Sequence, residues 1–219
     1  RFRNVTGVQT CALPIYLRAE LLGDAEQVVV VSAPSWRSTI ASVSMFQKVG
    51  PTWVRVAGPL PARVGRRGIS RTHHEGDGTT PAGSFAITGA LGSSTSAGTL
   101  LPYTQIVGGS CWISDSGRAD YNQLVSETPC SAPNENLARI ARSGPYRRLI
   151  TTGYNTSPVV PGAGSAIFLH VHHYRRSGGT YPTSGCVSLT SRNLNRLWSR
   201  LDPAKHPRVI IGKTSWLLA

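Results

Sequence analysis

The stretch FLHVHHYRRSGGTYPTSGCVSL, residues 168–189, joins two predicted strands through a loop rich in glycine and proline. Apolar runs predict strands over residues 165–174 and 186–190. Side chains alternate between the two faces of a strand. One face is therefore expected to carry Ala166, Phe168, His170 and His172, and the other Ile167, Leu169, Val171 and His173. Where the two strands adjoin, Cys186 is expected to lie near His170.

The rest of the chain repeats this pattern of short strands separated by turns. Strands are expected at 27–32, 39–45, 52–56, 84–88, 146–155 and 208–212, with turns at 58–61 and 65–68. One amphipathic helix is expected over 191–201, since Leu194, Leu197, Trp198 and Leu201 recur at helical spacing, and Thr190 or Ser191 can cap it. These features predict a mainly β fold, a sandwich or barrel-like domain with one amphipathic helix.

The composition of the 219 residues limits the classes of function. A formal net charge of +13 favours a polyanionic partner such as nucleic acid, anionic lipid or an anionic cell wall. The basic residues are scattered, as at Arg63, Arg66 and Arg71, and they form no recognition-helix pattern, so no nucleic-acid partner is expected. No apolar stretch reaches the ~20 residues of a membrane helix, and no transmembrane segment is expected.

The N-terminal segment looks foreign to the domain. Residues 5–15 read VTGVQTCALPI, which resembles the in-frame translation of a sequencing adapter. The expected division is a non-native leader over 1–16, a lead-in over 17–26 and a single folded domain over 27–214. Any export signal is then expected to be missing from this sequence.

Setting Cys11 aside leaves three cysteines, at positions 111, 130 and 186. Cys111 and Cys130 flank a turn-rich segment that a disulfide could close, with a stabilisation of about 3 kcal/mol. The alternative is a pair of buried free thiols. A disulfide would indicate an oxidising, extracytoplasmic compartment. Cys186 would then remain as a free thiol that needs an explanation.

Three interpretations fit the cysteine and histidine cluster. A thiolate nucleophile needs a nearby imidazole base, and a preceding glycine lets backbone N–H groups approach an oxyanion, which suits Cys186, His170 and Gly185. Cys186 could instead be a buried structural cysteine. A metal site built from His170, His172 or His173 and Cys186 is the third alternative. The neighbouring His73-His74 and EGDG run at 75–78 is interpreted as a structural turn.

Three motifs in order resemble the L,D-transpeptidase catalytic domain family, in its exported, actinobacterial-type branch. They are EGDGTTPAGSFAI at 75–87, GSAIFLH at 164–170 and TSGCV at 183–187, within a similarity that spans roughly residues 27–213. One position departs from the family pattern: Ser184 stands where the family has a histidine just before the glycine. Because position 171 is Val, only a backbone carbonyl there can orient the base.

The resemblance implies a β-rich L,D-transpeptidase-type catalytic domain over 27–214 that forms 3→3 cross-links in peptidoglycan from tetrapeptide stems, with L,D-carboxypeptidase activity when water is the acceptor. It implies Cys186 as nucleophile, His170 as general base and Gly185 on the oxyanion side. Ser184 replaces the family histidine, and His172, Thr183 and Tyr154 are expected to bind substrate. No metal or other cofactor is expected.

The expected partners are peptidoglycan stem peptides and anionic wall polymers, and the expected location is extracytoplasmic, with the chain a monomer. Two other functions stay open. One is a non-catalytic wall-binding module of the same fold, suggested by Ser184, and the other is a zinc hydrolase that uses His170, His172 and Cys186.

Overall fold

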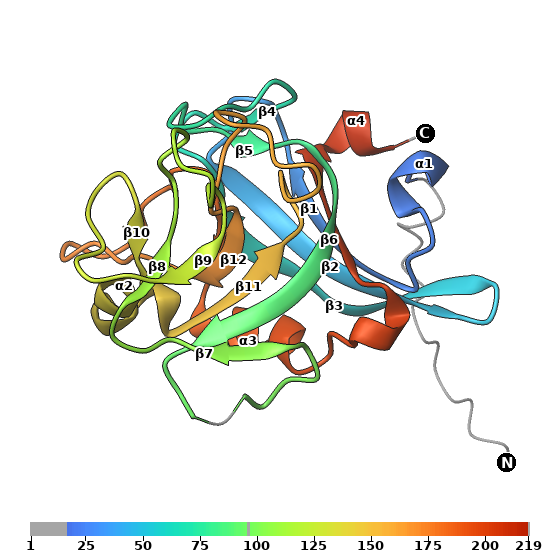
Figure 1. The fold of residues 1–219 in the computed structure, drawn as a ribbon. Helices are drawn as coiled ribbons and strands as arrows, with labels where there is room; N and C mark the ends of the chain where they lie inside the picture. Colours follow the sequence, from blue (N-terminus) through green and yellow to red (C-terminus); the bar gives the residue numbers. More distant parts are fainter. Residues whose placement is uncertain (1–16, 96, 219) are drawn as a thin grey trace, which may run out of the picture.

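A long mixed sheet curls on itself to form a barrel-like body in this computed structural model, which describes residues 17–95 and 97–218 (Figure 1). The expected leader over 1–16, with Cys11, lies outside the described residues. The strands hydrogen-bond in the order β11-β12-β13-β3-β2-β1-β14-β6-β7, and a further pairing of β11 with β6 closes the sheet. The prediction of a mainly β, barrel-like fold is confirmed.

The strands of this sheet are β1 (Gln27–Ala33), β2 (Ile40–Val49), β3 (Thr52–Arg63), β6 (Gly83–Gly92), β7 (Tyr103–Gln105), β11 (Arg148–Thr152), β12 (Phe168–Val171), β13 (Val187–Leu189) and β14 (Arg208–Lys213). Two short strands, β4 (Ile69–Ser70) and β5 (Thr80–Pro81), pair in parallel beside the barrel.

The interior of the barrel explains the apolar strands. β1 runs through VVVV at 28–31, and all four valines are buried. Val29 and Val31 belong to the main cluster, while Val28 and Val30 pack on the opposite face. That opposite face is covered by α1 (Ala19–Leu22) and α4 (Thr214–Leu217), whose Leu21 and Leu217 join the same outer cluster. A strand buried on both faces needs a continuous apolar run, which is why this one does not alternate.

The expected amphipathic helix is α3 (Ser191–Trp198), which ends three residues earlier than the expected limit at Leu201. The Thr190 hydroxyl caps it by accepting a hydrogen bond from the N–H of Asn193 at 3.1 Å. Leu194, Leu197 and Trp198 are buried in the main cluster, so α3 closes part of the core while its polar face meets solvent.

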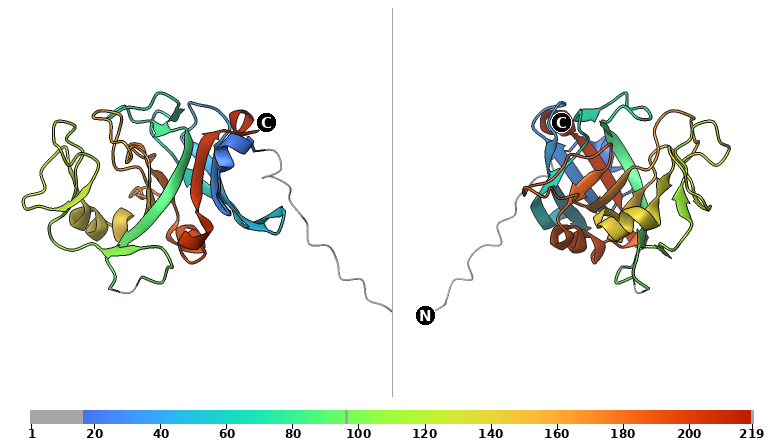
Figure 2. Two further views of the ribbon diagram at one scale, coloured as in Figure 1. Left: turned by 45° about the vertical axis from the view of Figure 1, so that its right-hand side comes forward. Right: turned by 90° about the vertical axis from the view of Figure 1, so that its left-hand side faces the viewer.

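A smaller layer stands beside the barrel, on the side away from α1 and α4 (Figure 2). It contains a sheet of β8 (Ser110–Trp112), β9 (Leu124–Ser126) and β10 (Glu135–Asn136), in the order β10-β8-β9, followed by α2 (Leu137–Ser143) and a short 3₁₀ turn, Pro145–Arg147. Trp112, Leu137 and Tyr146 from this layer pack on Phe168 of β12. Cys186 belongs to the same cluster, so the layer forms one wall of the region around the cysteine.

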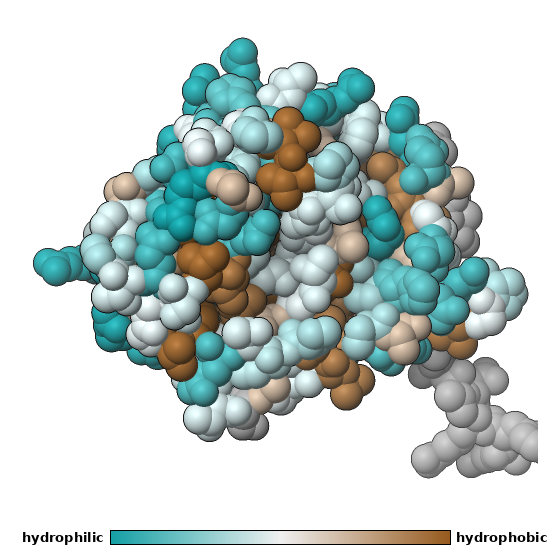
Figure 3. Space-filling model, viewed as in Figure 1, coloured by the Kyte–Doolittle hydropathy of each residue, from teal (hydrophilic) through white to brown (hydrophobic). Residues whose placement is uncertain are grey.

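The surface in view carries its apolar residues in separate small patches among hydrophilic ones (Figure 3). Within the described part of the chain, no helix has the length and hydrophobicity to cross a membrane.

The structure corrects three of the expected strand limits. The expected turn at 58–61 lies inside β3, because β3 bulges against β2 there; Gly58 has φ +98°, and a Cβ on it would sit 2.5 Å from the Val43 carbonyl oxygen. The strand expected over 165–174 is limited to Phe168–Val171, and the strand expected over 146–155 to Arg148–Thr152. Strand alternation therefore does not extend to His172 and His173.

Candidate active site

Cys186 lies directly before β13, held between two backbone groups that lead into β12. Its sulfur accepts a hydrogen bond from the N–H of Phe168 at 3.3 Å and donates one to the carbonyl of Ala166 at 3.1 Å. The residue is 7% exposed. Burial, and then the Glu135 carboxyl, raise the pKa of the thiol to about 12. Cys186 therefore rests as a protonated thiol that needs a base to become a nucleophile.

His170 lies on β12, opposite Ser188 of the parallel strand β13. Its Nδ1 is 2.7 Å from the carbonyl oxygen of Val171. A carbonyl only accepts, so Nδ1 carries the hydrogen and Nε2 keeps its lone pair. Burial first, and then the neighbouring His172 and His173, lower the pKa of His170 to about 4. The ring is neutral near pH 7, and Nε2 can accept a proton.

The residues before the cysteine fold into a tight loop. The Thr183 hydroxyl donates to the carbonyl of Cys186 at 2.5 Å and accepts from the N–H of Gly185 at 3.3 Å. A Cβ on Gly185 would lie 3.2 Å from the Thr79 carbonyl oxygen, which explains the glycine. Ser184 is exposed, and its hydroxyl accepts a hydrogen bond from Arg66 at 3.3 Å.

A first cavity of ≈ 250 Å³ opens on one side of the sulfur. Cys186 and His170 both line it, together with residues of the loop that joins their strands. Those loop residues are His173, Tyr181, Pro182, Thr183 and Ser184. The candidate nucleophile and the candidate base thus face a common space that can hold a small reacting group.

A second cavity of ≈ 200 Å³ is also lined by Cys186. It shares Cys186, Ser184 and Glu135 with the first cavity. Its remaining wall includes the charged and polar side chains of Arg66, His73, Glu75 and Ser165, and also Gly185. The sulfur therefore lies at the junction of two cavities, one with His170 and one with a mixed set of charges.

Two residues at this junction were missed by the sequence analysis, Glu135 of β10 and Tyr146 of the 3₁₀ turn. The Tyr146 hydroxyl donates to Glu135 Oε2 at 2.6 Å, and its ring meets His170 edge-on at 5.2 Å. Tyr146 also packs in one cluster with Cys186 and lines the first cavity with it. Desolvation raises the pKa of Glu135 to about 7. Neither residue lies in a recognisable motif, and only the packing of the smaller layer on β12 brings them to the cysteine.

Two of the residues expected to bind substrate lie elsewhere. His172 is buried, with Nδ1 2.9 Å from the Ser188 hydroxyl, and it lines a separate cavity with Arg147 and Arg148. The expected shared face of His170 and His172 is wrong, because β12 ends between them. Tyr154 lines neither cavity beside Cys186; its hydroxyl bonds the Ala163 carbonyl, and its ring packs edge-on against His73 and Phe85.

The 73–79 segment forms a turn, with its polar groups bound to one another. His73 Nδ1 lies 3.0 Å from both Asp77 Oδ1 and the Thr79 hydroxyl, and Asp77 accepts from the N–H of Thr79 at 2.7 Å. These contacts hold the His73 ring in the wall of the second cavity, 3.7 Å from the position of a Cβ on Gly185. Among the residues that the structure describes, no three His, Cys, Asp or Glu side chains are grouped closely enough to hold a metal ion.

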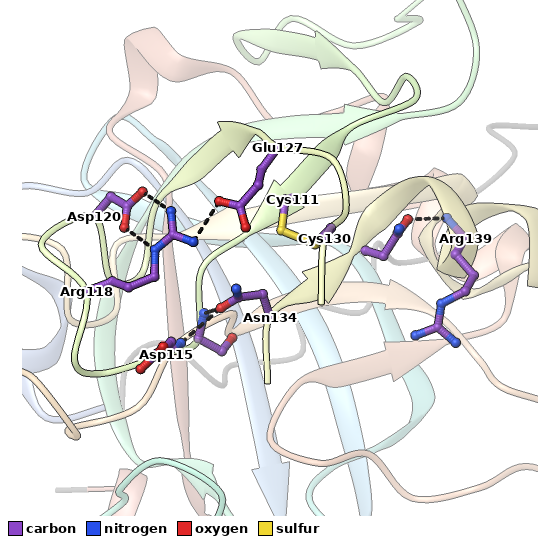
Figure 4. Close-up of a disulfide and its surroundings, with 10 residues drawn as sticks. Cys111, Asp115, Arg118, Asp120, Glu127, Cys130, Asn134 and Arg139 are labelled. Atoms are coloured by element: carbon purple, nitrogen blue, oxygen red, sulfur yellow. Dashed lines mark hydrogen bonds and ion pairs between the residues drawn. A yellow bond between two sulfur atoms is a disulfide. The ribbon is translucent and has the colours of Figure 1, made fainter. Parts of the chain in front are cut away.

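A disulfide joins Cys111 of β8 to Cys130, in the layer that carries Glu135 (Figure 4). Within the closed loop, Arg118 forms ion pairs with Asp120 at 2.7 Å and with Glu127 at 2.6 Å. Cys111 is also opposite Asn136 in the β8–β10 pairing. The disulfide therefore lies one position along the β8–β10 pairing from Glu135, whose carboxyl lines the cavities beside Cys186.

Comparison with known proteins gives one family and a fold likeness. The YkuD family, described as an L,D-transpeptidase catalytic domain, matches residues 51–211. Among solved structures, the helical cell shape determining protein Pgp2 from Campylobacter jejuni is 14% identical with a TM-score of 0.45, covering 90% of this chain and 51% of that chain. A lysine-to-alanine mutant of that protein is also 14% identical, with a TM-score of 0.44, and the match covers 90% of this chain and 54% of that chain. The chain spans about half the length of these proteins. No curated protein matches the sequence.

Proposed function

Because the chain belongs to the L,D-transpeptidase catalytic domain family, with 51–211 matched, we propose that it is a cysteine acyltransferase of peptidoglycan that forms 3→3 cross-links. The observation that carries this proposal is the place of Cys186, a free thiol at the junction of two cavities, one of which it shares with the neutral imidazole of His170.

The reaction begins with proton transfer from the Cys186 thiol to His170 Nε2. The thiolate attacks the carbonyl carbon before the terminal D-alanine of a tetrapeptide stem, and we assign the support of the oxyanion to backbone N–H groups next to Gly185. The C–N bond breaks as His170 returns the proton to the departing D-alanine amine. A side-chain amine of another stem then attacks the thioester, a new C–N bond forms, and the C–S bond breaks. Water in the place of that amine gives L,D-carboxypeptidase activity.

The two cavities suit different parts of this reaction. Both the leaving and the attacking amine exchange a proton with His170, which lines the first cavity. The acyl portion of the donor stem then occupies the second cavity, where Arg66 donates hydrogen bonds to a stem carboxylate and Glu75 accepts them from an amine. Thr183 lines the cavity of the amines, while Ser184 lines both cavities. We assign no substrate contact to His172 or Tyr154.

The compartment and partners follow from the same substrate. Peptidoglycan stems place the protein outside the cytoplasm, and the Cys111–Cys130 disulfide fits an oxidising compartment. The net charge of +13 suits anionic wall polymers as an additional partner. We propose that the protein works there as a monomer.

The test is intact-protein mass spectrometry after incubation with a tetrapeptide stem, with released D-alanine counted. The parent should show a thioester adduct and release D-alanine, while Cys186→Ala should do neither and His170→Gln should slow both. Adding an acceptor stem separates transfer from hydrolysis. No adduct and no D-alanine from folded parent protein contradicts the proposal.

A non-catalytic wall-binding module is the second candidate, favoured by the buried, protonated state of Cys186 and by Ser184 in place of histidine. It predicts that parent and Cys186→Ala bind peptidoglycan equally, with no D-alanine released from either. The zinc hydrolase has no such support, because His172 lies in a cavity separate from that of His170 and Cys186.

A further inference from the structure

The Glu135 carboxyl and the Tyr146 phenol form a hydrogen-bonded pair beside the reacting cysteine. Tyr146 is 5% exposed. Its hydroxyl lies 2.6 Å from Glu135 Oε2, and Tyr146 packs in one buried cluster with Cys186 and lines the same cavity. Glu135 itself is partly exposed but lines both cavities beside the sulfur. Nothing in the mechanism above uses either residue.

The phenol carries a single hydrogen, so it cannot donate to both neighbours at once. When Glu135 is ionised, the charged carboxylate is the stronger acceptor and takes that hydrogen. The sulfur is then left with the N–H of Phe168 and, as a thiol, donates to the Ala166 carbonyl. Loss of the thiol proton in this state would place two negative charges on either side of one hydroxyl, which is unfavourable.

When Glu135 is protonated, the order of donors reverses. The Glu135 carboxyl then donates to the Tyr146 phenol, and the phenol donates to the Cys186 sulfur. A thiolate at Cys186 gains a hydrogen bond and no longer faces the repulsion of a charged Glu135. Desolvation raises the pKa of Glu135 to about 7, so this protonated form is populated near neutral pH.

We propose that Tyr146 is a catalytic residue, whose hydroxyl donates to the Cys186 thiolate, and that Glu135 is a positioning residue that directs this hydrogen to sulfur when its carboxyl is protonated. The inference rests on the proposed role of Cys186 as nucleophile but not on the identity of its substrate. The proton balance is closed: the thiol proton goes to His170 Nε2, and the Glu135 proton stays on the carboxyl throughout.

The charged groups in both cavities influence whether the Glu135 carboxyl is protonated or ionised. Glu75 favours the protonated carboxyl. The remaining groups that share a cavity with Glu135 are Arg66 and His73 on one side and His170 and His173 on the other. Arg66 and any protonated histidine favour the ionised carboxyl. The pH at which Glu135 loses its proton is therefore set by all of these residues together and not by Glu135 alone.

The test measures the rate of Cys186 alkylation by iodoacetamide against pH, by intact mass, in the parent and in Glu135→Gln. The glutamine amide of this variant would remain neutral and donate a hydrogen to the phenol at every pH. The rate near pH 7.5 should rise about tenfold or more, because loss of one adjacent charge shifts a thiol pKa by about a unit, and the dependence on a group near pH 7 should disappear. An unchanged rate and profile overturn the inference.

Two further variants separate hydrogen bonding from a change in packing. Tyr146→Phe should lower the alkylation rate, and the double variant Glu135→Gln/Tyr146→Phe should lose most of the gain of Glu135→Gln. A gain that survives without the hydroxyl overturns the assignment of Tyr146. The matched control is Tyr103→Phe, which removes a partly buried hydroxyl that bonds the carbonyls of Gly92 and Ser94. Tyr103 lines neither cavity beside Cys186, and its variant should leave alkylation unchanged.

Substrate turnover distinguishes this inference from the proposed function. Failure of the function leaves the alkylation result standing, with no D-alanine released by any variant. If D-alanine is released, the alkaline limb of kcat/KM should move with Glu135→Gln, and a limb that stays in place contradicts the role of Glu135. Should Tyr146→Phe fail to fold, Glu135→Gln alone decides the outcome.

Discussion

Removal of the Cys111–Cys130 disulfide should measurably destabilise the whole domain. The two cysteines are separated by 19 positions, and the loop-entropy relation for a closed loop of that length gives about 3 kcal/mol at 25 °C. For a chain of this size, each kcal/mol shifts the melting temperature by about 2–4 °C. The double variant Cys111→Ala/Cys130→Ala should therefore melt about 6–12 °C below the parent protein.

Other contacts within the loop determine whether the measured loss of stability is larger or smaller than the loop-entropy value. Arg118 pairs with Asp120 and Glu127 inside the same loop, and ion pairs in contact with solvent contribute little to stability. They partly restrict the loop even without the covalent bond, so the measured loss should lie at or below the entropy figure.

The assay is thermal unfolding followed by circular dichroism, with and without a reducing agent. Reductant should lower the melting temperature of the parent to that of the double variant and should leave the double variant unchanged. Cys186→Ala is the matched control, because it removes a thiol but keeps the disulfide, and it should remain sensitive to reductant. A parent that melts at the same temperature under both conditions would refute the reasoning.

Three further substitutions test other parts of the structure. The pKa of His170 lies at about 4 in the fold against an ordinary 6.5, so only the unfolded chain binds a proton between these values, and stability should fall by up to about 3 kcal/mol as pH drops through that window. His170→Gln should remove this component in urea titrations at pH 7 and pH 4.5, and identical pH slopes would count against it. Gly185→Ala places a Cβ 3.2 Å from the Thr79 carbonyl and should abolish thioester formation while the protein still folds; normal turnover would show that the loop can shift. Thr190→Ala removes the cap on Asn193 and should lower the unfolding free energy by about 1 kcal/mol, whereas no loss in denaturant titration would show that water replaces the cap.

The parts of the fold that follow local patterns were predictable from sequence. The valine run at 28–31 and the apolar spacing of Leu194, Leu197 and Trp198 report burial within a single element, and both elements exist. The expected turn at 58–61 failed because glycine and proline also serve a bulge, and only the pairing of β2 with β3 distinguishes the two. The strand expected over 165–174 was too long because the apolar residues Ala166 and Ile167 precede the first residue of β12, and Ala166 has φ +53°, which is not a strand conformation.

The candidate site divides in the same way. Cys186 and His170 stand in motifs whose order could be recognised, whereas Glu135 and Tyr146 stand in none and reach the sulfur through the packing of a second layer on β12. His172 was misplaced because alternation was extended past the end of β12. A side chain that reaches a site by tertiary contact leaves no periodic trace in the sequence.

The parallel pairing of β12 with β13 has a consequence for how such a site can diversify. Parallel neighbours cannot be joined by a tight hairpin, so the chain must travel back along the barrel between His170 and Cys186. That obligatory return path, residues 172–185, also supplies the His173, Tyr181 and Pro182 side of the first cavity. Insertions or exchanges in the path would reshape what the cavity accepts while the ladder of backbone bonds keeps the base and the thiol in register. The return path therefore determines which substrates the cavity accepts, while the β12–β13 pairing holds the base and the thiol, so the two properties can change independently.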